Sequence, residues 1–379
     1  MKLMHFKTNN RAVKMFEKIK EFQSQAKPFE FGPIDQRDRI LLSVVLSKGQ
    51  GNLLQDQPLP EGILQSLGTS LDGREVARRV FQIFQRFFEQ PTAKTLLKDA
   101  PVVGVMTDAL YVNGRASRLH TGEPKHYVNV TAGTMLTGMV SIYRLIGNQT
   151  LRLLGPKAVQ DATSSYHNGD IFPIPRSLEI RKQALRCAIY GTIAVFCHEL
   201  AHVFRGHTTY LSSKLSLDYL EETSSASSNA VTRVRRLMEV DADEFAGKFI
   251  ADILFPKFVS NRTLLDDREG TRRFLNVAAG VLALYLGFGE GDNVYYSGSV
   301  RAYVVLGSLL QRCSNDSESS AWLLEQIEDI QSDMMKAELV DASNVKLDLD
   351  ELDDLLKVTI PARNAIAADW INLRPWGKD

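Results

Sequence analysis

Residues 177–206 read SLEIRKQALRCAIYGTIAVFCHELAHVFRG, a stretch whose apolar side chains recur at intervals of three, four and seven residues. This periodicity predicts a long apolar helix. Ser177 suits the N-cap because its hydroxyl can accept from free N–H groups, and Gly206 suits the end because glycine readily adopts a left-handed conformation. The pentapeptide HELAH, residues 198–202, therefore lies in the last turns of this helix.

HELAH places two histidines one helical turn apart. His198 and His202 share a face of the helix, so both imidazoles can bind one Zn²⁺. Glu199 is the candidate general base, which takes a proton from water activated by the metal. A catalytic zinc needs a third protein ligand and one open position, so a further His, Glu or Asp must come from elsewhere in the chain.

A second predicted helix, residues 231–255, offers that third ligand. Glu239 and Asp243 are four residues apart in the sequence EVDAD and share a face of this helix. Glu239 can reach the metal while Asp243 accepts the free ring N–H of a ligating histidine, which fixes the tautomer and orientation of that ring. Carboxylates at this spacing are ordinarily solvated surface charges, but here they follow HELAH and lie beside apolar residues, which favours a site.

The two motifs together resemble the signature of gluzincin-type metallopeptidases, in which HExxH is followed by a helix carrying E-x-x-A-D. The longer stretch HELAHVFRGH is similar to the H-E-x-x-H-x-x-x-G-H motif of the family of the phage-exclusion protease Lit. The resemblance covers residues 126–310 and implies a zincin-like fold, a bound Zn²⁺ and hydrolysis of peptide bonds. It also implies that Glu239 is the third zinc ligand and that Asp243 contacts a ligating histidine.

His207 closes this stretch but does not fit a third-histidine motif. A metzincin needs Gly and His at the positions that Arg205 and Thr208 occupy, and His207 comes one residue early. We interpret His207 as a histidine that caps the helix end or lies behind the metal ligands, rather than as a ligand itself.

The oxyanion of a tetrahedral intermediate needs a second donor besides zinc. Arg301, Tyr296 and His207 are the candidates for substrate or oxyanion contact, and Tyr295 and Tyr210 are further ones. In peptidases of this type an arginine follows a His-Pro element after the E-x-x-A-D helix. The sequence YSGSVR at residues 296–301 lacks His-Pro, so a surface or ion-paired Arg301 is an equal alternative.

The composition fits a globular protein of 379 residues, 44% hydrophobic and 24% charged. A net charge of zero gives no reason to expect a nucleic-acid partner. Three scattered cysteines and a polar N-terminus without a signal peptide favour the cytoplasm. The longest apolar run, residues 274–289, contains Asn276 and is shorter than the roughly 20 residues that span a bilayer. It predicts a core helix and no integral membrane segment, and it leaves peripheral membrane contact open.

Three regions are predicted along the chain: an N-terminal region of unknown role at residues 1–125, a zincin-like catalytic domain at 126–312, and a C-terminal helical extension at 313–379. The expected fold class is α+β, mainly helical with a small sheet. HYVNV, residues 126–130, is a candidate edge strand for substrate addition. Residues 155–175, rich in Pro, Gly and Ser, predict a loop. Further helices are predicted at residues 132–146, 271–287, 299–312 and 321–339.

The expected function is a zinc-dependent endopeptidase that acts on a protein or peptide substrate. Glu199 would take a proton from water and pass it to the leaving nitrogen. Two alternatives remain: a regulatory or toxin-like interaction protein with a structural zinc site, and a zinc hydrolase that acts on a non-peptide bond. If Glu239 is the third ligand, its carboxylate should approach the ring nitrogens of His198 and His202.

Overall fold

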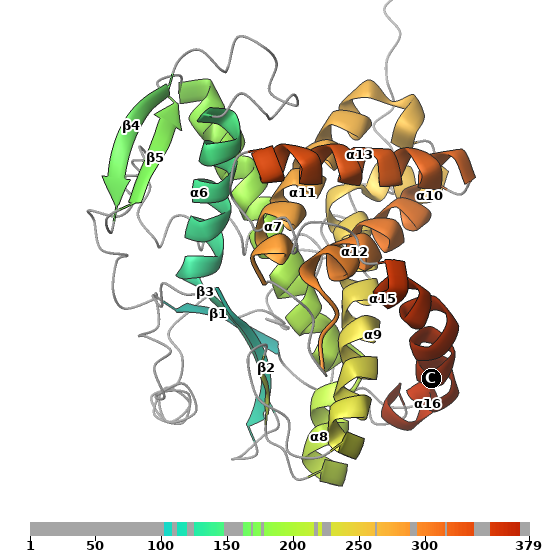
Figure 1. Cartoon of the computed structure of the whole chain (residues 1–379). Coiled ribbons are helices and arrows are strands. Elements are labelled where there is room, and N and C mark those ends of the chain that lie inside the picture. Colours follow the sequence, from blue (N-terminus) through green and yellow to red (C-terminus); the bar gives the residue numbers. More distant parts are fainter. Residues whose placement is uncertain are drawn as a thin grey trace, which may run out of the picture.

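The computed structural model describes residues 102–107, 112–119, 125–147, 162–167, 170–175, 178–215, 219–221, 229–261, 264–288, 294–314, 317–336 and 349–371. Most of these residues are helical, and a small sheet flanks the helices (Figure 1). The predicted α+β class is therefore confirmed. Nearly all of the predicted N-terminal region, up to residue 101, lies outside the described residues.

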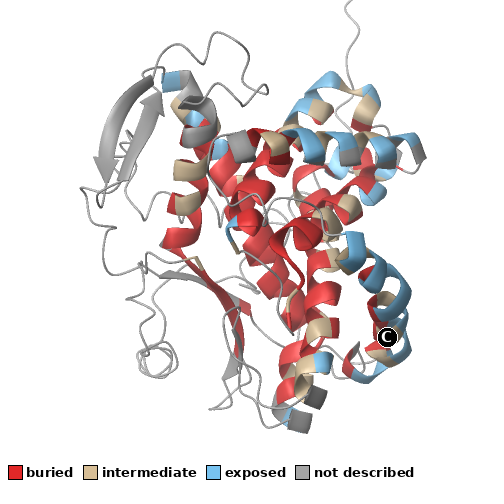
Figure 2. Ribbon diagram, viewed as in Figure 1, coloured by how far each residue is buried: buried red, intermediate tan, exposed pale blue. Residues whose placement is uncertain are grey.

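Long helices form the core, and the central one carries HELAH (Figure 1). They are α6 (Ala132–Gly147), α7 (Leu178–Phe204), α9 (Asn229–Leu254), α11 (Arg268–Tyr285) and α12 (Gly298–Cys313). Helix α7 packs against α6, α9 and α11, and each of its residues from Gly191 to Phe204 is buried (Figure 2). These helices confirm the helical predictions to within a few residues at each end.

The apolar character of α7 also satisfies a test for membrane-spanning helices. Within the described part of the chain, Arg181–Phe204 is the one stretch long and apolar enough to cross a bilayer, with a mean hydropathy of 1.4. However, 94% of its apolar window is buried inside the protein, as in the core helix of a globular domain. The predicted core helix at residues 274–289 corresponds to most of α11, which is likewise buried.

Further helices complete the helical layer (Figure 1). They are α8 (His207–Leu215), α10 (Pro256–Asn261), α13 (Ser317–Lys336), α15 (Leu349–Asp354), the π-helix η4 (Leu355–Thr359) and α16 (Ile360–Ile371), with 3₁₀ turns η2 (Leu264–Asp266) and η3 (Leu286–Phe288). Pro256 follows the end of α9 and opens α10, because proline cannot extend a helix from within but fits its first turn. Asp267 caps α11 by accepting from the Glu269 and Gly270 amides at 2.9 Å.

Four strands form the sheet in the order β1-β3-β2-β6 (Figure 1). They are β1 (Val102–Thr107), β2 (Gly114–Leu119), β3 (Lys125–Thr131) and β6 (Tyr219–Glu221). β1 pairs with β3 in parallel, while β2 runs antiparallel to both β3 and β6. The prediction of HYVNV as an edge strand is wrong, because β3 is hydrogen-bonded on both sides. Alternating polarity identifies a strand but does not reveal its neighbours.

The predicted loop at residues 155–175 is also wrong in part. It contains the antiparallel hairpin of β4 (Ala162–His167) and β5 (Asp170–Pro175), which lies beside α6 (Figure 1). The two residues between these strands, Asn168 and Gly169, are a favoured hairpin sequence. The abundance of Pro and Ser around them concealed that signal.

The packing crosses both predicted domain boundaries. β1 and β2 precede residue 125 yet pair with β3, which spans it, and β2 also contacts α7. Helix α16, from the predicted C-terminal extension, packs against α9 and α8. Both flanking regions therefore contribute described elements to the unit that contains HELAH.

Candidate metal centre

Helices α7 and α9 pack together and bring HELAH opposite EVDAD. His198, His202 and Glu239 form the one group of potential metal ligands that the described residues contain, with ligand atoms within 4.8 Å of one another. Each of the three side chains is at most 4% exposed. The expected approach of Glu239 to both histidines is confirmed, and the group could hold a metal ion.

The spacing of the three ligand atoms fits a small cation. His198 Nε2 lies 3.0 Å from His202 Nε2 and 3.0 Å from Glu239 Oε2, and His202 Nε2 lies 3.6 Å from the same oxygen. In a tetrahedral site with metal–ligand bonds of about 2.0–2.1 Å, the ligand atoms lie about 3.3 Å apart. The three distances bracket this value, so little movement is needed to complete such a site.

His198 is oriented by a carboxylate on its other side. Its Nδ1 lies 2.8 Å from Asp243 Oδ1, as predicted. Arg301 of α12 holds Asp243 in turn, with Nε donating to Oδ2 at 2.9 Å and Nη2 donating to Oδ1 at 3.2 Å. Burial would raise the pKa of the Asp243 carboxyl, but Arg301 and His198 outweigh burial and lower it. Because an ionised carboxylate only accepts, Nδ1 of His198 donates to Asp243, and Nε2 is the ring nitrogen that faces the centre.

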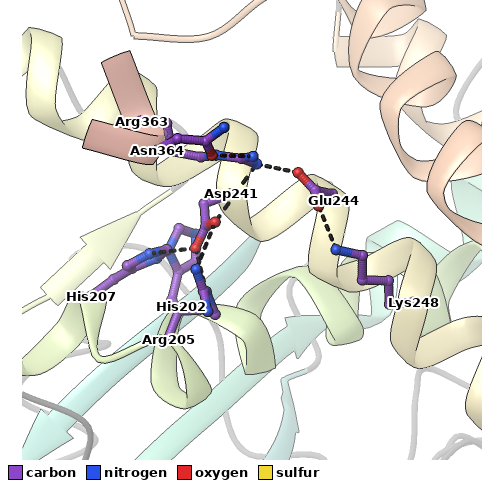
Figure 3. Close-up of polar contacts among 8 residues, drawn as sticks. All are labelled: His202, Arg205, His207, Asp241, Glu244, Lys248, Arg363 and Asn364. Atoms are coloured by element: carbon purple, nitrogen blue, oxygen red, sulfur yellow. Dashed lines mark hydrogen bonds and ion pairs between the residues drawn. The ribbon is translucent and has the colours of Figure 1, made fainter. Parts of the chain in front are cut away.

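His202 is oriented by a second histidine (Figure 3). Its Nδ1 lies 2.9 Å from Nδ1 of His207, whose Nε2 lies 3.1 Å from Asp241 Oδ2. Burial lowers the pKa of His207 to about 4, although Asp241 opposes this, so the ring is neutral at neutral pH. Because Nε2 of His207 donates to Asp241, its Nδ1 accepts from His202. The other ring nitrogen of His202, Nε2, faces the centre.

Glu239 depends on the two histidines for its charge balance. Burial would raise the pKa of Glu239, but positive charge on His202 and His198 and hydrogen bonds from their rings outweigh burial and hold the pKa well below its usual range. Asp241 and Asp243 have arginine partners, whereas the described partners of Glu239 are the two histidines. A bound cation would replace the protons on the histidine rings and supply the positive charge that the buried carboxylate needs.

Gly206 places His207 behind His202. Its φ of 81° lies in the left-handed region, and its amide donates to Val203 O at 3.0 Å. Helix α7 therefore ends where the sequence predicts, and α8 begins at His207. The interpretation of His207 as a histidine behind the ligands is confirmed by its contact with His202.

Glu199 lies against the start of β2. Its side chain is buried, and a Cβ atom added to Gly114 would lie 2.6 Å from Glu199 Oε1 and 3.0 Å from Val195 Cγ1. Glycine is therefore needed at position 114 to leave room for this carboxylate. The preceding Asn113 is fixed by its backbone amide, which donates to Thr131 Oγ1 at 3.2 Å. The N-terminal region, which contains no recognisable chemical motif, thus borders the candidate general base.

The residues predicted as oxyanion donors are engaged elsewhere. Arg301 is 4% exposed, and its guanidinium binds Asp243, as in the ion-paired alternative. The guanidinium carbon also lies 5.1 Å from the centroid of the Tyr295 ring. The Tyr296 hydroxyl donates to Asp354 Oδ2 at 2.5 Å, and burial followed by this carboxylate raises its pKa to about 12. Tyr210 packs against Trp370. The contacts described for these three side chains are with residues other than His198, His202 and Glu239.

Several residues behind the centre carry no local signal in the sequence. Asp241 occupies a variable position of E-x-x-A-D, and Arg363 and Trp370 lie far along the chain in α16. His126, to which the sequence assigns no role, is buried in β3 with Nδ1 3.4 Å from Thr208 Oγ1. Only the three-dimensional packing reveals these residues.

The chain matches no protein-family model, and neither a curated protein nor a solved structure is significantly similar to it. The similarity to gluzincins therefore depends on the two motifs and on the geometry of the centre.

Proposed function

We propose that this protein is a zinc-dependent endopeptidase of the gluzincin type, similar to the Lit family. The observation that carries the proposal is the convergence of His198, His202 and Glu239, three buried ligands of the right chemistry, directly beside Glu199. The proposed substrate is a protein or peptide. The three described cysteines, Cys187, Cys197 and Cys313, are buried and free, which fits the proposed cytoplasmic location.

Zinc is the proposed metal because of the donor set. Two imidazole nitrogens and one carboxylate oxygen match the His₂Glu ligands of catalytic zinc sites. Mg²⁺ and Ca²⁺ prefer sites built from oxygen alone. Zn²⁺ at this site supplies Lewis acidity, which activates water and polarises a carbonyl group.

Glu199 performs the proton transfers in the proposed reaction. Its carboxylate takes a proton from the attacking water and delivers it to the nitrogen of the departing amine. Glu199 is 2% exposed and its carboxylate lies against Gly114, so little rotamer freedom is lost when it acts. Asp243 and His207 hold the two imidazoles so that their Nε2 lone pairs stay directed at the same point.

The two alternative functions make different demands on the centre. A structural zinc site in an interaction protein is closed by four protein ligands, whereas three converge among the described residues. This difference favours a catalytic site with an open position. A hydrolase of non-peptide bonds would use the same three ligands, so the substrate itself must separate it from an endopeptidase.

The test compares the purified protein with Glu199→Gln, which keeps the shape of the side chain but cannot accept the proton. We expect one Zn²⁺ per chain in both proteins by elemental analysis, and a fall in proteolysis of about 10²–10⁴-fold in the variant. Substrates are found by comparing new peptide termini in a proteome exposed to each protein. Wild-type protein without stoichiometric metal, or full activity in Glu199→Gln, would contradict the proposal. Zinc binding without any new termini would favour a non-peptide substrate.

A further inference from the structure

We infer that helix α16 is part of the metal site, with Arg363 and Trp370 as positioning residues that hold His202 in place through His207 and Asp241. The inference depends on the metal centre of the proposed function. It concerns how that centre is held together by a part of the chain that the sequence sets apart as an extension.

The first step is the chain of contacts that leads outward from His202 (Figure 3). His202 contacts His207 at 2.9 Å, and His207 contacts Asp241 at 3.1 Å. All three side chains are at most 1% exposed, so no bulk water can replace a lost contact. The orientation of the His202 ring therefore depends on where Asp241 is held.

The second step is the pair of arginines that hold Asp241 (Figure 3). Arg205 donates to it through Nε at 2.6 Å and through Nη2 at 3.1 Å. Arg363 of α16 approaches the other side, with Nη1 3.7 Å from Asp241 Oδ1, and also donates to Glu244. Because Arg363 is 7% exposed and bridges two acids of α9, it ties α16 to the helix that provides Glu239.

The third step is the indole that covers His207. Trp370 is fully buried, and its ring centroid lies 5.1 Å from that of His207 at an interplanar angle of 88°. It belongs to a small apolar cluster with Leu211 of α8 and Leu237 of α9. Trp370 lies seven residues after Arg363, so both side chains share a face of α16. One face of α16 therefore contacts both groups behind His202: Trp370 packs against His207, and Arg363 forms an ion pair with Asp241.

A further set of contacts anchors the segment that leads into α16. The amide of Ser297 donates to Glu351 Oε2 at 2.9 Å, and the Tyr296 hydroxyl contacts Asp354 and Thr359. These contacts join α15 and η4 to the chain just before α12. Residues 349–371 are therefore docked at both ends of their described length.

The consequence for metal binding follows from the effect of outer contacts on ligands. Loss of a group that orients a ligating histidine typically lowers metal affinity by about 10–100-fold. Arg363 and Trp370 act on His202 only through Asp241 and His207. We therefore expect a fall in Zn²⁺ affinity at the lower end of that range, about tenfold, when either residue is changed. The described contacts of His198 lead instead to Asp243 of α9, which Arg301 of α12 holds.

The experiment measures Zn²⁺ affinity of the full chain by competition with a chromophoric chelator, and the visible spectrum of bound Co²⁺ as a report on ligand geometry. The variants are Arg363→Ala, Arg363→Lys and Trp370→Phe. The matched control is Arg312→Ala, which removes an arginine of α12 that pairs at 3.1 Å with Asp252, another acid of α9. We expect about tenfold weaker Zn²⁺ binding and an altered Co²⁺ spectrum in Arg363→Ala, partial recovery in Arg363→Lys, and no change in Arg312→Ala.

Equal affinities and identical Co²⁺ spectra in Arg363→Ala and Arg312→Ala would overturn the inference. If Arg363→Ala does not fold, Arg363→Lys and Trp370→Phe decide the question, since both conserve most of the side-chain volume. If the wild-type protein binds Zn²⁺ but shows no proteolysis, the proposed function is wrong, and the measured Zn²⁺ affinities of the variants still decide this inference. A wild-type chain that binds no metal would remove both.

Discussion

His198 and His202 lie one turn apart on α7, yet the groups behind them are organised differently. His198 is held by Asp243, whose other partner is the fully enclosed Arg301 of α12. His202 is held through a second histidine by Asp241, which pairs with Arg205 from the turn after α7 and with Arg363 from α16. The first arrangement is short and closed. The second is longer, less enclosed and dependent on the C-terminal helix, so the two should respond differently to mutation and pH.

The largest effect is expected at Asp243. Asp243→Ala leaves the Arg301 guanidinium, 4% exposed, without its carboxylate. Removing one partner of a buried ion pair costs about 3–5 kcal/mol, because the remaining charge is uncompensated. Urea unfolding of the metal-free protein measures this loss. A loss of unfolding free energy smaller than that of Asp241→Ala, measured in the same way, would contradict the proposed difference between the two arrangements.

A smaller effect is expected at Asp241. Asp241→Asn removes the charge that Arg205 and His207 contact, but the Arg205 side chain is 15% exposed and Arg363 keeps Glu244. A charge-assisted hydrogen bond contributes about 1.5–3 kcal/mol, so the loss of unfolding free energy should lie in this range. The same urea unfolding experiment gives the value. Asp241→Asn should also weaken Zn²⁺ binding, which chelator competition measures.

The smallest effect is expected at the link between α9 and α16. Burial would raise the pKa of the Glu244 carboxyl, but Lys248 and Arg363 outweigh burial and lower it from its ordinary value of 4.5. A depressed folded-state pKa contributes stability that is present above the unfolded pKa and is lost as the pH falls through the folded pKa. The metal-free protein should therefore lose part of its unfolding free energy below about pH 4.5.

Glu244→Gln isolates this contribution. Its unfolding free energy, measured by urea titration at a series of pH values, should fall less steeply on acidification than that of the wild type. Glu269 pairs with Arg273 on the exposed surface of α11, and Glu269→Gln is the matched control that should leave the slope unchanged. Parallel curves for Glu244→Gln and the wild type would show that the charge of Glu244 does not hold α16.

Much of the centre is readable from two short motifs. HELAH and EVDAD each define residues that share a helix face, and the structure brings those faces together with Glu239 beside both histidines and Asp243 behind His198. The role of Arg301 was open between an oxyanion donor and an ion pair, and its contact with Asp243 corresponds to the ion pair. Position along the chain does not distinguish the two, because both require an arginine near α9.

The sheet is less readable from the sequence. HYVNV predicts a strand, but its place inside the sheet depends on β1 and β2, whose pairing is not encoded in β3 itself. The hairpin of β4 and β5 is hidden in a Pro- and Ser-rich stretch. Gly114 has no motif around it, and its importance appears only where β2 meets Glu199.

The sequence alone determined the helix that carries His198 and His202, and the facing of Glu239 and Asp243 on a second helix. Helical periodicity is a local property, so residues four apart share a face whatever the rest of the chain does. Tertiary structure alone decided that α16 lies behind the centre and that Arg363 and Trp370 reach Asp241 and His207. Those contacts join residues far apart in the chain. They form because apolar helix faces are buried against one another, and the sequence pattern of one helix does not specify which other helix covers it.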